Sequence, residues 1–225
     1  MGQARTSAGW GSLLLGVVGA LVVLGAQEPT QITPGAPQKG AFGQFADRVK
    51  WQMPIRVMDE IGVKPGMTVA DVGAGDGWFT FYLADRVGSP GRVIAEDIDA
   101  QALKVLRERC AQEKVSNVST LVGGMEDPKL PAGAVDVALM VNVLSALGNA
   151  KNFLANLAKG LKPDGRLVVI DWDPVKLYPE MAAQATAALR EQTLRQLQDA
   201  DFEVVKVLDF LPTQTMWICK RRARD

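Results

Sequence analysis

The chain has 225 residues, and none of them is histidine; only two, Cys110 and Cys219, are cysteine. Without histidine the chain cannot form a Ser-His-Asp triad or a Cys/His zinc site. The two cysteines are not arranged as Cys-x-x-Cys, so the sequence gives no sign of redox chemistry. We expect two buried thiols rather than a structural disulfide.

The chain also lacks an excess of charge, because Lys+Arg and Asp+Glu each number 25 and the formal net charge is zero. A balanced chain has no electrostatic footprint for nucleic acid. Its only basic cluster is KRRAR at residues 220–224, which we interpret as a solvated chain end.

Long apolar runs are confined to the N-terminus, where residues 13–24 read LLLGVVGALVVL. Arg5 precedes this run and Ala26 follows it, as in a secretory signal peptide cleaved after Ala26. An uncleaved membrane anchor through residues 10–26 is the main alternative, and a buried helix is a third. We therefore expect a signal or anchor at residues 1–26, a flexible Pro/Gly/Gln-rich linker at 27–45 and the folded domain at 46–225.

The two interpretations place the domain differently. A signal peptide would export it, to the periplasm in a bacterium, whereas an anchor would tether it to the membrane. Lys39, Arg48, Lys50 and Arg56 follow the apolar run and slightly favour a cytoplasmic domain behind an anchor.

A glycine-rich segment at residues 71–77 is the most informative motif. An apolar run at 67–70 leads into Asp71, and Gly73, Gly75 and Gly77 alternate with other residues before a helix-like stretch. This pattern predicts a strand, a tight loop and a helix whose first N–H groups are free for a nucleotide-like cofactor. Trp78 stands where a dinucleotide fingerprint has its third glycine.

The rest of the chain alternates strands and helices, which predicts a doubly wound, mostly parallel α/β sheet. We expect strands at residues 68–72, 92–98, 118–122, 135–141, 166–171, 202–208 and 215–220. Helices are expected at 46–61, 77–87, 100–113, 151–161 and 179–200. No helix fits between the last two strands, so they form a hairpin and one of them runs antiparallel.

Polar residues follow the strands at the edge where ligands of such sheets bind. Asp71 could orient the loop, bind an ammonium group or cap the loop's own amides. Asp97 could accept hydrogen bonds from both hydroxyls of a ribose. Glu96, the residue before it, is the alternative if the strand has the other register. Ile98 would then lie beside an adenine.

The next two strand ends offer further candidates. After residues 118–122, Met125 could pack on an adenine face, and Glu126 or Asp127 could accept from its amino group. Asn142 ends the following strand, where it would face a reacting group or be purely structural.

Residues 48–220 resemble a bacterial class I S-adenosylmethionine (SAM)-dependent methyltransferase. The resemblance is carried by WQMP at residues 51–54, GVKPGMTVADVGAGDG at 62–77, DPKLP at 127–131, LKPDGRL at 161–167 and DFEVV at 201–205. It implies a Rossmann-like sheet of seven strands with an antiparallel last strand, and SAM as the cofactor. It also implies that Gly73, Gly75 and Gly77 approach the methionine part, that Asp97 holds the ribose and that Glu126 lies by the adenine.

The chain departs from similar family members at residues 143–146, where VLSA replaces an aromatic residue and histidines. The Asn/Asp-Pro-Pro-aromatic motif of enzymes that methylate nucleic acids is absent at 142–145. We therefore expect a small-molecule methyl acceptor and no nucleic-acid partner. Asp171 and Asp173 are the candidate bases, with Asn142 as a further catalytic candidate.

Two other functions stay open at this point. One is a non-catalytic SAM-binding or scaffold protein, and the other is an NAD(P)-dependent oxidoreductase. The sequence predicts no metal site and leaves the oligomeric state open.

Overall fold

The computed structural model describes residues 48–178 and 183–222. The signal or anchor expected at residues 1–26 and the linker expected at 27–45 lie outside these ranges. Within them, no helix is long and apolar enough to cross a membrane.

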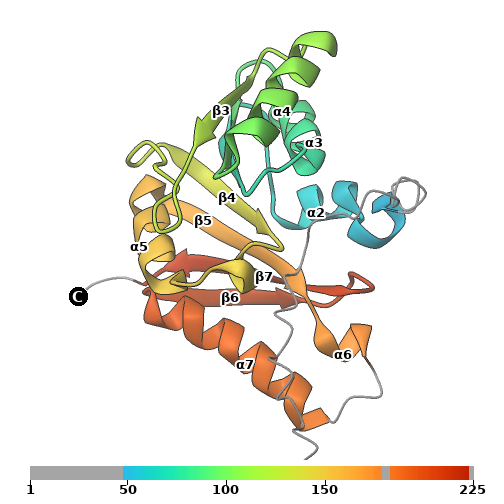
Figure 1. The fold of residues 1–225 in the computed structure, drawn as a ribbon, viewed down its shortest axis with the longest axis vertical. Helices are drawn as coiled ribbons and strands as arrows, with labels where there is room; N and C mark the ends of the chain where they lie inside the picture. The colour runs from blue at the N-terminus through green and yellow to red at the C-terminus, as the bar shows by residue number, and fades with distance from the viewer. Residues whose placement is uncertain (1–47, 179–182, 223–225) are drawn as a thin grey trace, which may run out of the picture. The chain divides into compact units, whose positions relative to one another are not determined.

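A seven-stranded sheet forms the centre of the domain, with strand order β3-β2-β1-β4-β5-β7-β6 (Figure 1). The strands are β1 (Thr68–Val72), β2 (Arg92–Asp97), β3 (Val118–Val122), β4 (Val135–Val141), β5 (Leu161–Trp172), β6 (Phe202–Leu208) and β7 (Gln214–Arg221). β1 to β5 pair in parallel, whereas β7 is antiparallel to both β5 and β6. The predicted fold class and C-terminal hairpin are confirmed, and the reversed strand lies between β5 and β6.

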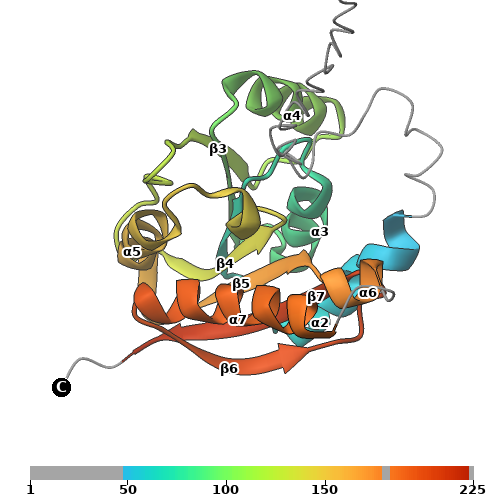
Figure 2. The same cartoon turned by 60° about the horizontal axis from the view of Figure 1, so that its bottom comes forward.

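Helices cover both faces of the sheet because the central strands are apolar on both sides. The helices are α2 (Pro54–Glu60), α3 (Trp78–Val87), α4 (Ala100–Gln112), α5 (Ala150–Gly160), α6 (Pro174–Leu177) and α7 (Ala183–Asp199), with a 3₁₀ turn at Leu144–Ala146. α2 and α3 pack on one face, around Val69 and Val93. α5 and α7 pack on the other, around Ala70 and Val72, and Figure 2 shows α7 running along β6 and β7.

Three local predictions differ from the structure. The expected helix at 46–61 is interrupted at Met53, whose φ of 44° is left-handed, before Pro54 starts α2. The strand expected at 166–171 is longer: β5 begins at Leu161 and contains a bulge, since the pairing jumps from Val135↔Leu161 to Val137↔Arg166. The short α6 was not expected.

Cys110 and Cys219 are both buried and free, as expected. Burial raises the pKa of Cys219 to about 12, so this thiol is chemically inert at neutral pH.

Candidate functional site

The loop between β1 and α3 is built on three glycines with left-handed backbone, at φ values of 72° (Gly73), 54° (Gly75) and 80° (Gly77). A Cβ on Gly73 would lie 2.3 Å from the Val143 side chain, and one on Gly77 would lie 2.3 Å from Leu106. A Cβ on Gly75 would meet nothing within 4 Å. Two glycines therefore permit close packing, and the middle one borders open space.

Asp97 ends β2 directly beside this loop. Its Oδ2 accepts a hydrogen bond from the Gly75 amide at 2.8 Å, and its Oδ1 accepts from the Asp99 amide at 2.9 Å. Two backbone donors thus fix a half-buried carboxylate at the open side of the loop. Ile98, the next residue, is 53% exposed, so its apolar side chain is accessible to a ligand.

Glu96, the alternative considered for Asp97, lies in the interior and is only 3% exposed. Successive side chains point to opposite faces of a strand, so only one of the two acids can face the open side. The geometry favours Asp97 for a ligand at the loop.

Asp71 is buried on β1 and lies under the loop. Its Oδ2 accepts from the Thr80 hydroxyl at 2.6 Å, which ties the first turn of α3 to the sheet. Burial raises the pKa of Asp71 to about 6, and the Thr80 hydrogen bond partly offsets this. The contact supports a role in orienting the loop, whereas capping of the loop amides by Asp71 is not found among the described contacts.

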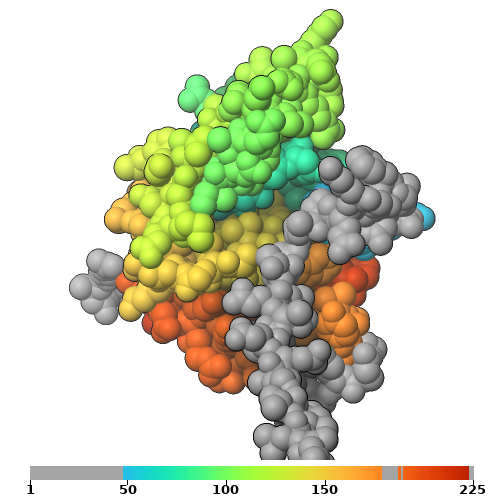
Figure 3. Space-filling model, viewed as in Figure 1, coloured from blue at the N-terminus to red at the C-terminus, as the bar shows by residue number. Residues whose placement is uncertain are grey.

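The segment after β3 places Met125 outward, with 68% of its surface exposed. The Glu126 carboxylate instead accepts from Asn149 Nδ2 at 3.2 Å and from Asn152 Nδ2 at 3.0 Å. Asn156 Nδ2 donates to the Glu126 carbonyl at 2.8 Å. These bonds hold the loop against α5, and the two surfaces meet in Figure 3. Contact between Glu126 and an adenine stays a prediction, as it does for Asp127, whose Oδ1 accepts from the Lys129 amide.

Asn142 ends β4 with a left-handed φ of 58°. Its Oδ1 accepts from Gln214 Nε2 at 2.7 Å, and the next residue, Val143, packs against Gly73. The structure therefore brings Asn142 close to the glycine loop, as expected from its position at a strand end.

The two candidate bases already have several hydrogen-bond donors each. Asp171 accepts from the amide and hydroxyl of Ser145 and from the Trp172 amide, and burial raises its pKa despite these bonds. Asp173 caps α6 and accepts from Thr215 and Arg190. Burial alone would raise the pKa of Asp173, but the bonds from Arg190 and Thr215 outweigh it and lower the pKa. These contacts give both acids structural roles and do not support Asp173 as a base.

The sequence assigned no role to the helical residues 48–52, which form a further wall of the site. The Arg48 guanidinium lies 4.7 Å from the centre of the Trp78 ring and 3.8 Å from the Asp76 carboxylate. Arg48 also donates to the Gln52 side-chain oxygen. Buried Gln52 Nε2 and Trp78 Nε1 have no hydrogen-bond partner within the described chain. The WQMP motif held the signal, but its contacts depend on tertiary packing.

Trp51 of the same segment stacks on Trp172 at the end of β5, with ring centres 5.4 Å apart and planes 24° from parallel. Trp172 pairs in the sheet with Gln214, the partner of Asn142. Trp51 and Trp172 thus form an aromatic wall at the carboxyl end of β5, on the same side of the domain as the glycine loop.

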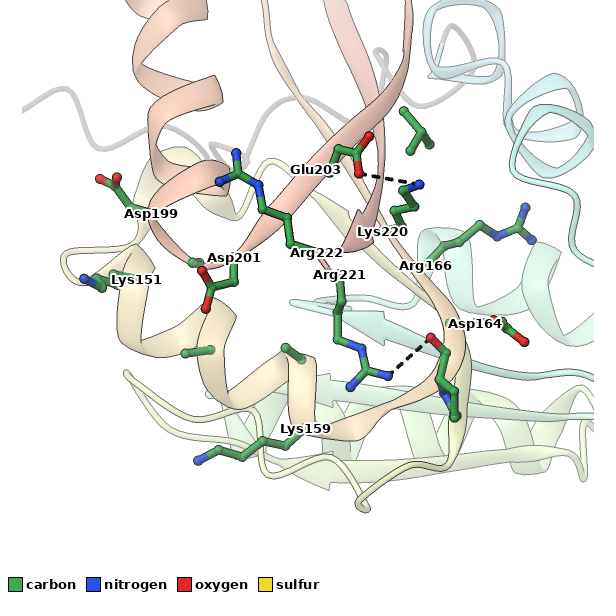
Figure 4. Close-up of a pocket in the computed structure, with 16 residues that line it drawn as sticks. Lys151, Lys159, Asp164, Arg166, Asp199, Asp201, Glu203, Lys220, Arg221 and Arg222 are labelled. Carbon is green, nitrogen blue, oxygen red and sulfur yellow. Dashed lines mark hydrogen bonds and ion pairs between the residues drawn. The ribbon is translucent and has the colours of Figure 1, made fainter. Parts of the chain in front are cut away.

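A hollow of about 1020 Å³ lies at the other edge, near the start of β5 and the end of β7 (Figure 4). Its charged side chains are Lys151, Lys159, Arg166, Lys220, Arg221 and Arg222, together with Asp164, Asp199, Asp201 and Glu203. Charges of both signs mix here, and Lys220 pairs with Glu203 at 3.4 Å. It is remote from the glycine loop, so its size does not make it the candidate site. No cluster that could hold a metal occurs in the described ranges.

Residues 63–215 match a family model described as a methyltransferase domain. The chain is similar to a nocamycin O-methyltransferase of Saccharothrix syringae, at 32% identity over 50% of this chain and 40% of the relative. It is also similar to a ubiquinone/menaquinone biosynthesis C-methyltransferase of Hydrogenovibrio crunogenus, at 31% identity over 51% of this chain and 45% of the relative. The matched region is thus less than half the length of either curated relative.

The fold is similar to the crystal structure of a SAM-dependent methyltransferase from Aquifex aeolicus, with a TM-score of 0.66 and 28% identity. This similarity covers 77% of the present chain and 92% of the other. It therefore extends over nearly the whole of that protein.

Proposed function

The chain belongs to the methyltransferase domain family and has the class I SAM-dependent fold, and from this premise we propose that it methylates a small-molecule acceptor with SAM. The observation that carries the proposal is the open space at Gly75 with the Asp97 carboxylate fixed beside it. A glycine loop of this kind lets a ligand approach the backbone closely, and the acid adds a strong acceptor for hydroxyl groups.

The remaining groups at this edge fit the parts of SAM. The unpartnered donors Gln52 Nε2 and Trp78 Nε1, with the Arg48 guanidinium nearby, suit the amino-acid carboxylate. Asp97 suits the ribose hydroxyls. The exposed side chains of Ile98 and Met125 suit an apolar, flat adenine. Each part of the cofactor thus has a chemically matched group at this end of the sheet.

The acceptor would bind on the β4–β5 side of the glycine loop. The stacked pair Trp51 and Trp172 favours an acceptor with a flat, apolar body. The two relatives named above are, by their names, methyltransferases of nocamycin and of ubiquinone/menaquinone biosynthesis, which supports a small organic acceptor. We therefore place the acceptor against this aromatic wall.

For methyl transfer, the protein mainly has to align the acceptor with the methyl group of SAM. Bound SAM supplies a methyl group that is already activated on a sulfonium. The residues at this edge would orient the acceptor for in-line attack and exclude water. Asp171 and Asp173 already accept hydrogen bonds from groups of the protein. The proposal therefore favours a nucleophile that reacts without a strong general base, such as an acidic phenol or enol.

The first prediction concerns Asp97. Replacing it with alanine removes the acceptor beside Gly75, so we expect S-adenosylhomocysteine (SAH) affinity of the full chain to fall by about tenfold or more in calorimetry. Asp164→Asn, in the distant hollow, is the matched control and should bind like the wild type. A wild-type protein that binds neither SAH nor SAM would contradict the proposed function.

Turnover separates an enzyme from a non-catalytic SAM-binding protein. The full chain would be incubated with methyl-labelled SAM and a panel of phenols, quinols and enols. One methylated product supports the proposal, and SAM binding without any transfer across the panel would favour the scaffold alternative.

A further inference from the structure

Glu96 is a buried acid that the proposed cofactor contacts do not use. It lies one residue before Asp97 and faces the opposite side of β2, with only 3% of its surface exposed. A glutamate is rarely this buried unless a specific contact or a special protonation state maintains it there.

The Glu96 carboxyl group lies between two glycines that follow the neighbouring strands β1 and β3. A Cβ on Gly123, just after β3, would lie 1.7 Å from Glu96 Oε1, so a side chain there would displace the Glu96 carboxyl group from its present position. The Gly73 amide, just after β1, points to Glu96 Oε2 at 3.4 Å while it also donates to the Glu96 carbonyl at 2.8 Å. The Glu96 side chain therefore connects the glycine loop with the loop after β3.

The charged groups that shift the pKa of Glu96 are all acids. Asp71 on β1, Asp97 on β2 and Asp127 in the loop after β3 act on it, and no cation is among the groups that shift its titration. Lys129, in the same loop as Asp127, packs near Gly124. Burial is the largest cause that raises the pKa of Glu96, to about 8, and the three acids add to it against the Gly73 hydrogen bond. The carboxyl group is therefore mostly neutral at pH 7.

We propose that Glu96 is a positioning residue of the cofactor site that acts as a neutral carboxylic acid and keeps the Gly73 and Gly123 loops together beneath the bound nucleoside. The inference rests on the proposed function. When the proton leaves to water, a negative charge forms at a buried position near three other acids, and the carboxylate moves toward solvent. The glycine loop then loses its contact with the Glu96 side chain. Only the fraction of the protein in which Glu96 is protonated binds the cofactor well.

The test is calorimetric titration of the full chain with SAH from about pH 6.5 to about pH 9.5, since affinity should scale with the binding-competent fraction. Wild-type affinity should fall about tenfold from pH 7 to pH 9, because a group with a pKa of about 8 is then mostly ionised. Glu96→Gln keeps the shape without the charge, so it should bind within about threefold of the wild type at pH 7 and lack this fall. Titration of the SAH amino group is common to both proteins, and the ratio of their affinities removes it.

Asp127→Asn is the second variant, because it removes one of the acids that raise the pKa of Glu96. Its Asn oxygen can still accept from the Lys129 amide, and the fall in affinity should move to lower pH. Infrared difference spectra of the wild type should show a protonated carboxyl group that disappears near pH 8 and, in Asp127→Asn, at lower pH; this readout serves even if Glu96→Gln fails to fold.

The outcomes separate the two proposals. Equal falls in wild type and Glu96→Gln, or no carboxyl group that titrates near pH 8, would overturn the role of Glu96 and leave the proposed function intact. Absence of SAH binding by both proteins at every pH would overturn the proposed function itself.

Discussion

At the scale of single residues, the three glycines of the loop differ in what they make room for. Gly73 and Gly77 admit the side chains of Val143 and Leu106, which belong to the protein itself. Gly75 borders open space, and its amide donates a hydrogen bond to Asp97. The motif looks uniform in the sequence, yet only its middle glycine borders open space.

Alanine at these positions should therefore have separable effects. Gly77→Ala combines a left-handed φ with an overlap at Leu106, and we expect a loss of about 2–4 kcal/mol in unfolding free energy. Gly75→Ala should cost only about 1 kcal/mol of stability but should weaken SAH binding about tenfold or more, since its methyl group enters the open side. Denaturant unfolding and calorimetry measure the two effects, and a reversed order would contradict this division.

Glu96 and Asp97 illustrate how position decides the role of similar side chains. Both are acids at the end of β2, but strand alternation sends one to the interior and the other to the loop. Their neighbours, rather than their own chemistry, separate the proposed positioning residue Glu96 from the proposed ligand contact Asp97.

At the scale of elements, the helical residues 48–52 are part of the site although they precede the sheet in the chain. The break at Met53 separates them from α2 and lets Arg48 and Trp51 reach Trp78 and Trp172. This segment leaves Gln52 Nε2 buried without a partner in the described chain, a costly state that a bound carboxylate would relieve.

The substitution Gln52→Met tests whether Gln52 binds the carboxylate of the cofactor. The change removes an unpartnered donor, so we expect the unfolding free energy of the free protein to stay within about 1 kcal/mol of wild type or to rise. SAH affinity should fall about tenfold, because the donor for the cofactor's carboxylate is lost. Thermal unfolding with and without SAH checks both effects, and unchanged affinity would remove Gln52 from the proposed site.

At the scale of the whole molecule, the topology separates two regions. The ends of β1, β2, β4 and β5 gather the proposed site at one edge of the sheet, whereas the mixed-charge hollow lies at the other (Figures 1 and 4). The cofactor proposal also raises the question of supply, because SAM is made in the cytosol and the N-terminal sequence is typical of export or anchoring.

We propose that residues 1–26 are either a cleaved export signal or a membrane anchor with the domain on the cytoplasmic side. Cell fractionation with N-terminal sequencing distinguishes them. A soluble protein beginning near Gln27 supports export, and a membrane-bound protein that retains residues 1–26 supports the anchor. A soluble protein that retains residues 1–26 would contradict both.

By itself the sequence determined the fold class, nearly all strand positions, the glycine loop and the reversed hairpin, because apolar periodicity and glycine placement are local properties. Only the tertiary structure decided which acid faces the loop, that Glu126 is bound to α5, and that Asp173 is paired with Arg190. It also added residues 48–52 to the site. These contacts join residues that lie far apart in the chain, and their partners are chosen by packing.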